Sequence, residues 1–320
     1  METRANPVDG AVARARSPFQ FASSLNTARL LTVDRLPAAV TAVFFLALFL
    51  PQIIDLAKDW WTLPEAGHGL LLAPVAIWLA FKSGIRKDAS PQRALGLATL
   101  IVAVFIRCAA GLAAEMFSMR VSMVIALAGL TIYHFGFKQV LHWWLPFALA
   151  CLAIPLPELV TQALARPLQF RASRMGAALL EMRHVPVLLS GNVIRLPGHE
   201  LFVTEACSGL RSLTALLSVG VLMSAVVLDT VVGRVLLVLI AIPIAIVVNG
   251  FRVFMTGFLV FFVSPELGEG FMHLTEGWLL FLVSLGTLAS VAWITLAIER
   301  RVKMWHGGVT EISEVEIANA

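Results

Sequence analysis

Long hydrophobic runs alternate with short polar segments along most of the chain. A membrane-spanning helix needs about 20 apolar residues, and the runs predict eight spans, at about 38–54, 68–81, 94–112, 116–134, 139–155, 206–228, 233–262 and 271–298. The second run is short, and the seventh is too long for one straight span. Pro243 and the pair Asn249-Gly250 are positions where the seventh run could kink or break. The pattern predicts an all-α polytopic membrane protein.

A more polar region, 156–205, interrupts the series of spans. Its first part, 158–182, has helical periodicity, and Pro167 is expected to split it into two short helices. This spacing predicts an amphipathic helical segment on the outer membrane surface. Its apolar and polar faces are expected to carry, respectively, Val160, Leu164 and Leu168, and Gln162, Arg166, Gln169 and Ser173.

The second part of this region alternates β-favouring stretches with two turn signals, Ser190-Gly191-Asn192 and Pro197-Gly198. Short strands separated by such turns are typical of hairpins. We expect a small three-stranded sheet that leads directly into the segment TEACSGLRSL. The whole insertion is therefore predicted to combine a helical part with a β-stranded part.

The composition supports a membrane protein. Of 320 residues, 59% are hydrophobic and only 14% are charged, whereas soluble domains carry about 25% charged residues. This balance excludes a soluble enzyme, a nucleic-acid-binding domain and a disordered chain, so the expected surroundings are a lipid bilayer without nucleic acid. The three cysteines fit neither a metal site nor a disulfide framework, and no cofactor is expected.

The basic residues predict an orientation. With the N-terminus inside, the cytoplasmic segments collect 14 of the 24 Lys and Arg residues, as the positive-inside rule requires. Five Arg in the insertion run against the rule, which long loops obey less strictly. We expect a cytoplasmic tail over 1–37 that is not a cleavable signal peptide, a membrane domain over 38–298, and a cytoplasmic tail over 299–320.

Charged groups inside spans are costly and usually functional. Arg107 and Arg252 are predicted in the outer halves of their spans, and Arg211, Cys207 and His273 lie at outer span ends. Residues far apart in the sequence thus reach one depth, near the outer interface. There a reactive thiol, an imidazole and a guanidinium could act together.

The surroundings of Cys207 favour a thiolate. If Thr204 caps a helix, Cys207 lies in its first turn, and Arg211 follows one turn later. His273 could act as general base or acid, with Glu276 or Glu269 orienting its ring. Asn249 shares a helical face with Arg252, and a guanidinium there could stabilise an oxyanion or hold substrate. This constellation suggests acyl transfer through a thioester.

Other interpretations stay open on spacing alone. A membrane Cys is usually a packing residue, a His near a span end is usually an interfacial anchor, and an intramembrane Arg can pair with a carboxylate. A polytopic transporter with an arginine-lined pathway, or a non-catalytic assembly factor for polysaccharide export, would fit the same residues. The transporter predicts polar residues that continue to the inner side, where the spans are apolar.

The order of motifs resembles the exosortase/archaeosortase family of membrane cysteine transpeptidases. The resemblance runs from about residue 60 to residue 300 and is densest in GNVIRLPGHELFVTEACSGLRSL. That segment contains Asn192 and a core in which Glu205 and Ser208 flank Cys207. It continues in VNGFRV and HLTEGW, and the early pair His68-Gly69 also fits.

The resemblance implies that the catalytic residues are Cys207, Arg252 and His273. It also implies a bacterial cytoplasmic-membrane enzyme with its active site on the extracytoplasmic side. Its expected substrates are exported proteins with a C-terminal sorting tail of the PEP-CTERM kind, consisting of a motif, a membrane helix and a basic cluster. The acceptor, on an envelope or exopolysaccharide pathway, is not specified. An acidic residue in the motif would be met by Arg211 or Arg107.

Overall fold

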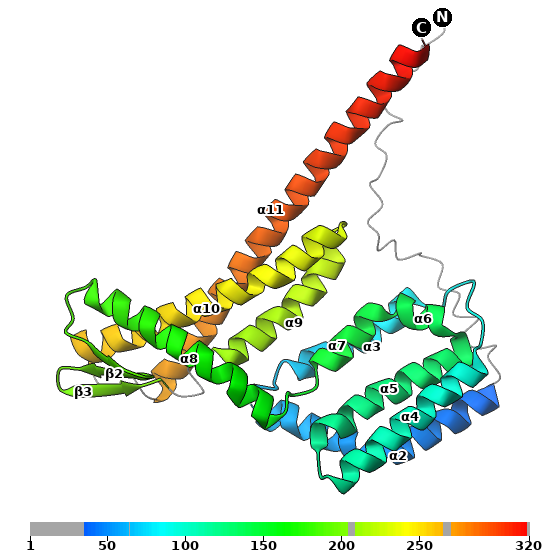
Figure 1. Cartoon of the computed structure of the whole chain (residues 1–320), viewed down its shortest axis with the longest axis horizontal. Coiled ribbons are helices and arrows are strands. Elements are labelled where there is room, and N and C mark those ends of the chain that lie inside the picture. The colour runs from blue at the N-terminus through cyan, green and yellow to red at the C-terminus, as the bar shows by residue number, and fades with distance from the viewer. Residues whose placement is uncertain (1–34, 64, 204–208, 265–269, 319–320) are drawn as a thin grey trace, which may run out of the picture.

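The structure is a computed structural model that describes residues 35–63, 65–203, 209–264 and 270–318. In the last helix it describes side chains only over 278–304. Two groups of helices lie next to each other (Figure 1). We call residues 35–152 the first lobe and residues 158–318 the second lobe.

The first lobe is helical, and the second adds a small sheet to four helices. The first contains α2 (Arg35–Thr62), α3 (Gly69–Ser83), α4 (Arg93–Leu112), α5 (Met116–Phe135), α6 (Phe137–His142) and α7 (Trp144–Leu152). The second contains α8 (Glu158–Glu181), β1 (Leu188–Ser190), β2 (Val193–Leu196), β3 (His199–Phe202), α9 (Leu210–Val227), α10 (Val231–Phe262) and α11 (Gly270–Ala318).

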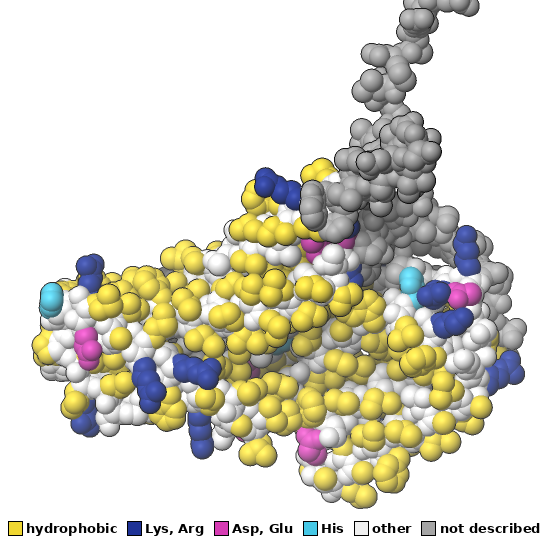
Figure 2. Space-filling view, turned by 45° about the horizontal axis from the view of Figure 1, so that its top comes forward, with side chains coloured by type: hydrophobic (Ala, Val, Ile, Leu, Met, Phe, Trp, Pro, Cys, Tyr) yellow, Lys and Arg dark blue, Asp and Glu magenta, His cyan; other side chains and the backbone are white. Residues whose placement is uncertain are grey.

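The predicted fold class is confirmed. Among the described residues, six helices are long and apolar enough to cross a membrane, and α3 is a shorter apolar helix. The spans lie in α2, α4, α5, α9, α10 and α11. A broad hydrophobic band covers both lobes, and the Lys and Arg side chains gather mostly towards its two ends (Figure 2). This surface is suited to a bilayer, with the charged groups at the interfaces.

The predicted span over 139–155 is not one helix. The chain leaves helical conformation at Trp143 (φ −92°, ψ 24°), which separates α6 from α7. The indole Nε1 of Trp143 donates to the carbonyl of Gly84 at 3.0 Å. The break therefore lets this segment bind the loop after α3.

Gln139 of α6 makes the same connection from a fully buried position. Its Oε1 accepts from the backbone N–H of Arg86 at 2.9 Å, and its Nε2 donates to the carbonyl of Gly84 at 3.0 Å. Backbone groups that leave water need such partners. One buried amide side chain thus fixes the loop between α3 and α4.

The long seventh run forms one unbroken helix despite Pro243. The N-terminus of α10 is capped by its own Thr230 and by Glu299 of α11, whose carboxylate accepts from the backbone N–H groups of Asp229 and Thr230 at 3.0 and 3.3 Å. The other end extends into a core with α8 and the sheet, where Val253 and Val260 are buried. The helix exceeds a span because its last part packs against protein.

The sheet is present as predicted. Its order is β1-β2-β3, both pairs are antiparallel, and Ile194 lies opposite Leu201 in the central pairing. Ile194 and Leu196 of β2 are buried in the core that also contains Leu180 of α8. One face of the sheet therefore rests on α8 and α10, and the opposite face is exposed.

One expectation for 158–182 is wrong. α8 continues through Pro167 as one helix of 24 residues, because packing along α10 outweighs the roughly 3 kcal/mol that a helical proline costs. The face of α8 that packs against protein carries polar residues. Gln169 and Ser173 are buried, at 8% and 0% exposure, whereas Val160 and Leu164 are exposed.

Small side chains explain why this face of α8 is the buried one. The buried face of α8 consists mainly of residues that let α10 approach closely, and the larger apolar side chains point away from that contact. The members of the buried face are Ala165, Gln169, Ala172, Ser173, Gly176, Ala177 and Leu180. In membrane proteins, close helix contact is achieved through small residues rather than through large apolar ones.

Candidate functional site

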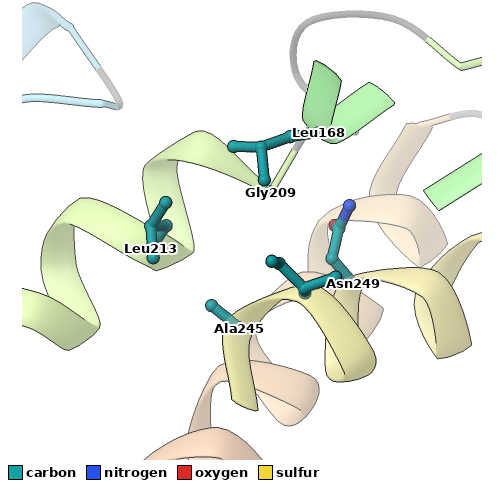
Figure 3. A pocket seen from close by; sticks show the side chains of 6 residues that line it. Leu168, Gly209, Leu213, Ala245 and Asn249 are labelled. Carbon is teal, nitrogen blue, oxygen red and sulfur yellow. The ribbon is translucent and has the colours of Figure 1, made fainter. Parts of the chain in front are cut away.

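A narrow crevice lies where α8, α9 and α10 meet (Figure 3). It is lined by Leu168 of α8, Gly209 and Leu213 at the start of α9, and Ala245, Ile246 and Asn249 of α10. The Asn249 side chain rises from α10 towards the beginning of α9. The crevice is where segments around residues 168, 209 and 249 come together.

Gly209 makes the closest approach in this crevice. Its φ is +78°, in the left-handed region that favours glycine. A Cβ added to it would lie 2.5 Å from Cγ and 2.8 Å from Nδ2 of Asn249. The backbone at Gly209 therefore lies directly on the Asn249 amide, and the position tolerates no larger residue without displacement.

α9 begins at Leu210, after Gly209 at its N-terminal cap. The expected helix start at Thr204 is therefore not the start of α9, and Arg211 rather than Cys207 occupies its first turn. Gly209, in left-handed conformation, directly precedes the first helical residue. The local reason is the glycine, whose conformation a helical residue does not adopt.

Asn249 and Arg252 are one turn apart on α10. Residues at i, i+3 and i+7 share a helical face, so Thr256 lies on this face too. Asn249 is 6% exposed and Thr256 3%, and the Thr256 hydroxyl donates to the carbonyl of Arg252 at 3.0 Å. Arg252 itself is half-buried. The predicted sharing of one face by Asn249 and Arg252 is thus present.

α8 supports the adjacent face of α10. A Cβ on Gly176 would lie 2.6 Å from Cγ1 of Val253, and one on Gly257 would lie 2.8 Å from Cδ1 of Leu180. A Cβ on Gly250, next to Asn249, would overlap the side chain of Met175. Tight packing of α8 therefore fixes the part of α10 that carries Asn249 and Arg252.

Asn192 holds the chain just before the segment that contains Cys207. Its carbonyl accepts from the backbone N–H of Val203 at 3.0 Å, and its Nδ2 donates to the carbonyl of Val203 at 3.0 Å. The sequence pattern singled out Asn192 as part of a turn signal and through the resemblance, without a role for its side chain. The structure gives it one, because it fixes Val203 at the end of the sheet.

Several predicted site residues cannot be placed in atomic detail. Glu205, Cys207 and Ser208 lie outside the described residues, as does Glu269. The backbone of His273 and Glu276 belongs to the first turns of α11, and their side chains are outside the described part of the chain. Their contacts with Arg252 therefore stay predictions.

Three other candidates lie apart from the crevice or at its margin. Arg211 is exposed in the first turn of α9. Arg107 belongs to the first lobe, where its guanidinium carbon lies 5.3 Å from the ring centroid of Phe49. His68 also belongs to the first lobe, and its Nε2 donates to the carbonyl of Leu152 at 3.1 Å. The structure does not bring Arg107 or His68 to Asn249.

The pair His68-Gly69 has a packing role. A Cβ on Gly69 would overlap the indole of Trp60, whose Nε1 donates to the carbonyl of Ala153 at 2.7 Å. Together with the bond from His68 to Leu152, these contacts join α2, α3 and the end of α7. The His68-Gly69 pair, which forms the early part of the resemblance, thus helps to connect these three helices.

Sequence reasoning missed the small-residue contact that supports the site. The signal was available, because Ala165, Ala172, Ser173, Gly176 and Ala177 recur at spacings of three, four or seven residues. Such spacing of small residues marks close helix contacts in membranes. Within the described residues no group of three His, Cys, Asp or Glu side chains is placed to hold a metal ion.

The comparisons with known proteins show the family. The family described as transmembrane exosortase matches residues 60–290, which include parts of both lobes and the segments that meet at Asn249. No curated protein and no solved structure matches the chain. The matched part covers most of the chain, and the protein belongs to the transmembrane exosortase family.

Proposed function

We propose that the chain is an integral-membrane cysteine transpeptidase. It cleaves C-terminal sorting tails of exported proteins at the outer membrane–water interface through a thioester on Cys207. His273 acts as general base and acid, and Arg252 supplies positive charge to the reacting carbonyl. Membership of the transmembrane exosortase family supports this activity.

One observation carries the assignment of residues. Gly209 lies directly on Asn249, which shares a helical face with Arg252. Consecutive Cα atoms are about 3.8 Å apart, so Cys207 lies within about 7.6 Å of Gly209 along the chain. The cysteine motif and the Asn-x-x-Arg motif therefore belong to one site.

The packing of α10 with α11 supports including His273. Near the inner end, Gly233 faces Glu299 and Thr295, and Leu288 shares a buried cluster with Ala241. If this antiparallel register continues along both helices, residue 273 reaches the level of residue 256. That level is about one helical turn beyond Arg252.

The proposed reaction has two balanced steps. The Cys207 thiolate attacks the scissile carbonyl, the C–N bond breaks, and the amine leaves with a proton from His273. An acceptor amine or water then gives a proton to His273, attacks the thioester and releases the thiolate. Arg252 stabilises the oxyanion that forms in both steps.

The proposed orientation places the site outside the cytoplasm. The loop after α3 and the α9–α10 turn lie at one end of their helices, where Arg86, Lys138, Arg234 and Lys303 gather. The positive-inside rule assigns this end to the cytoplasm. The sheet and the start of α9 then face the extracytoplasmic side of a bacterial cytoplasmic membrane.

Cleavage of a co-expressed reporter tests the proposal. The reporter carries a candidate motif, a membrane helix and a basic cluster, and its size is followed by immunoblotting. We expect wild type to shorten it and Cys207→Ala to leave it intact, while Cys207→Ser retains at most a trace. Mass spectrometry should find an acylated Cys207 in wild type. Cleavage by Cys207→Ala would exclude the thioester mechanism.

Matched variants separate catalysis from folding. Cys108 and Cys151 are exposed cysteines elsewhere, so Cys108→Ala and Cys151→Ala should cleave normally. His273→Ala should lose activity in both steps. Arg252→Lys keeps the charge and loses the planar guanidinium, so a strong loss would indicate that geometry matters. Normal cleavage by His273→Ala would remove it from the mechanism.

A further inference from the structure

The sheet has an edge that no described strand covers. Its order ends at β3, which runs from His199 to Phe202. In an antiparallel pair, the residues alternate between positions that bond to the partner and positions that do not. The bond from Val203 to Asn192, which lie opposite each other, fixes this alternation.

The alternation determines which groups point outward. Leu201 is two residues from Val203 and bonds to β2, so the N–H and C=O groups of Glu200 and Phe202 point away from β2. Among the described residues, no hydrogen bond is made by these four backbone groups. Phe202 is 58% exposed. The edge therefore has two residues ready to pair with another extended chain.

Apart from its short length, β3 lacks the usual protection of an edge strand. Proteins cover such edges or interrupt them with Lys, Pro or a bulge. The sequence His199-Glu200-Leu201-Phe202 contains none of these residues, and the regular register with β2 has no bulge. Its charged side chain, Glu200, is paired with Arg195 of β2 at 2.9 Å. An unprotected edge can bind a peptide by strand addition.

The edge also leads directly to the proposed site. The chain passes from β3 through Val203 and the segment with Cys207 into α9, which enters the membrane region. The proposed substrate has the same order, because an exported part is followed by a motif and then by a membrane helix. A substrate that runs parallel to β3 would place its motif beside Cys207 and its helix beside α9.

We propose that the free edge of β3 binds the extended part of the sorting tail as a fourth, parallel strand. The backbone groups of Glu200 and Phe202 pair with the substrate backbone just before its scissile bond. This inference rests on the proposed function. It adds that the enzyme recognises an extended backbone, with side chains selected at alternate positions.

Disulfide scanning tests the strand arrangement without requiring catalysis. The full-length enzyme carries Cys108→Ala, Cys151→Ala and Cys207→Ser, together with either Glu200→Cys or Phe202→Cys, so that the order of the cross-linked positions can be read. The reporter carries one cysteine at each position of the motif in turn. We expect cross-links at every second substrate position, in an order that indicates a parallel strand. Leu188→Cys, on the opposite edge and 61% exposed, is the matched control and should not cross-link.

Every other cross-linking pattern overturns the proposal. Cross-links at helical spacing would indicate a docked helix, and an antiparallel order would reject the parallel strand. Cross-links between two enzyme chains would make the edge a self-association surface. Cleavage by wild type without any cross-link from Phe202→Cys would reject strand addition and leave the proposed function intact. Cross-linking by the cysteine variants, together with no cleavage by wild type, would reject the proposed function alone.

A backbone variant gives a second readout. Phe202→Pro removes the outward N–H, whereas Phe202→Ala removes only the side chain. One hydrogen bond is worth about 1 kcal/mol, so we expect kcat/KM of Phe202→Pro to be roughly fivefold below that of Phe202→Ala. Equal values for the two folded variants would contradict pairing at this N–H group.

Discussion

The two lobes are held together in different ways. In the first lobe, the tightest helix pair joins neighbours in sequence, α4 and α5, where a Cβ on Gly96 would lie 2.5 Å from the backbone of Tyr133. In the second lobe, close approaches connect distant segments, such as Gly176 with Val253 and Gly209 with Asn249. The first lobe is therefore built around a local helix pair, and the second around contacts between distant segments.

The polar contacts differ as well. In the first lobe, the side chains of Gln139, Trp143 and His68 bind loop backbone groups at the helix ends. In the second lobe, the crevice is shaped by glycines that remove side-chain volume. Loss of a hydrogen bond should therefore have its strongest effect in the first lobe, and insertion of a methyl group should have its strongest effect in the second. The following variants test this difference.

The largest effect is expected for Gly209→Ala. The new Cβ meets Asn249 at 2.5 Å, and the residue has a φ of +78°. Displacement of a reacting group by about 1 Å can lower a rate about 100-fold, and we expect a loss of this size in reporter cleavage. Gly198→Ala is the matched control, because its φ is +80° and nothing lies within 4 Å. Equal activities of the two variants would show that the contact with Asn249 is unimportant.

A smaller effect is expected for Gly176→Ala, at the contact of α8 with α10. Overpacking of a close contact costs about 1–3 kcal/mol, and the shift of α10 should also lower the cleavage rate. Gly286→Ala is the control, since a Cβ there meets nothing within 4 Å. Alanine in an open helical position is expected to stabilise by roughly 0.5–1 kcal/mol. The unfolding temperatures of the two variants in detergent should therefore shift in opposite directions from that of wild type.

Gln139→Met tests the first lobe. The thioether fills the space of the amide and leaves the N–H of Arg86 without its partner, at a cost of about 1–3 kcal/mol. We expect a lower unfolding temperature and an unchanged cleavage rate per folded molecule. Gln162→Met, on the exposed side of α8, should change neither quantity. A rate loss in Gln139→Met without destabilisation would contradict the separation of the lobes.

The smallest effect concerns Glu115, which caps α5. Hydrogen bonds from the side chain and backbone of Ser118, and from the backbone of Phe117, lower the pKa of Glu115 below 4.5. The ionised Glu115 cap stabilises the folded state above pH 4.5, and this stabilisation is lost as the pH falls through the pKa that Glu115 has in the folded protein. Glu115→Gln cannot titrate, so its stability should approach that of wild type as the pH falls through this lowered pKa. Caps contribute about 1 kcal/mol, which unfolding curves can resolve. If the difference in unfolding free energy between Glu115→Gln and wild type were the same at every pH, Glu115 would be ruled out as the titrating group.

The spans and the sheet could be predicted because the sequence carries their requirements directly. Lipid forces backbone groups into helices and demands apolar runs, and Ser190-Gly191-Asn192 and Pro197-Gly198 mark the two hairpin turns. The break at Trp143 was missed because its cause is a distant carbonyl, that of Gly84. The length of α10 was ambiguous for the same kind of reason, since its last part packs on β-strands rather than on lipid.

The site was predicted only in part. The face shared by Asn249 and Arg252 follows from helical spacing, and the structure contains it. The sequence did not indicate which face of α8 packs against protein, because an exposed apolar residue such as Leu164 is unfavourable in water and acceptable beside lipid. The contact of Gly209 with Asn249 joins segments 40 residues apart, and no local pattern encodes such a pairing.

The length of α10 has a mechanical consequence. Glu299 fixes one end of this helix and the sheet core fixes the other, so α10 acts as a rod with Asn249 and Arg252 at set heights along it. A bilayer that becomes thinner or thicker is accommodated mainly by tilt. Tilting a rod that is clamped at both ends moves the sheet and the crevice together. The distance between the edge of β3 and Asn249 is therefore insulated from changes in membrane thickness.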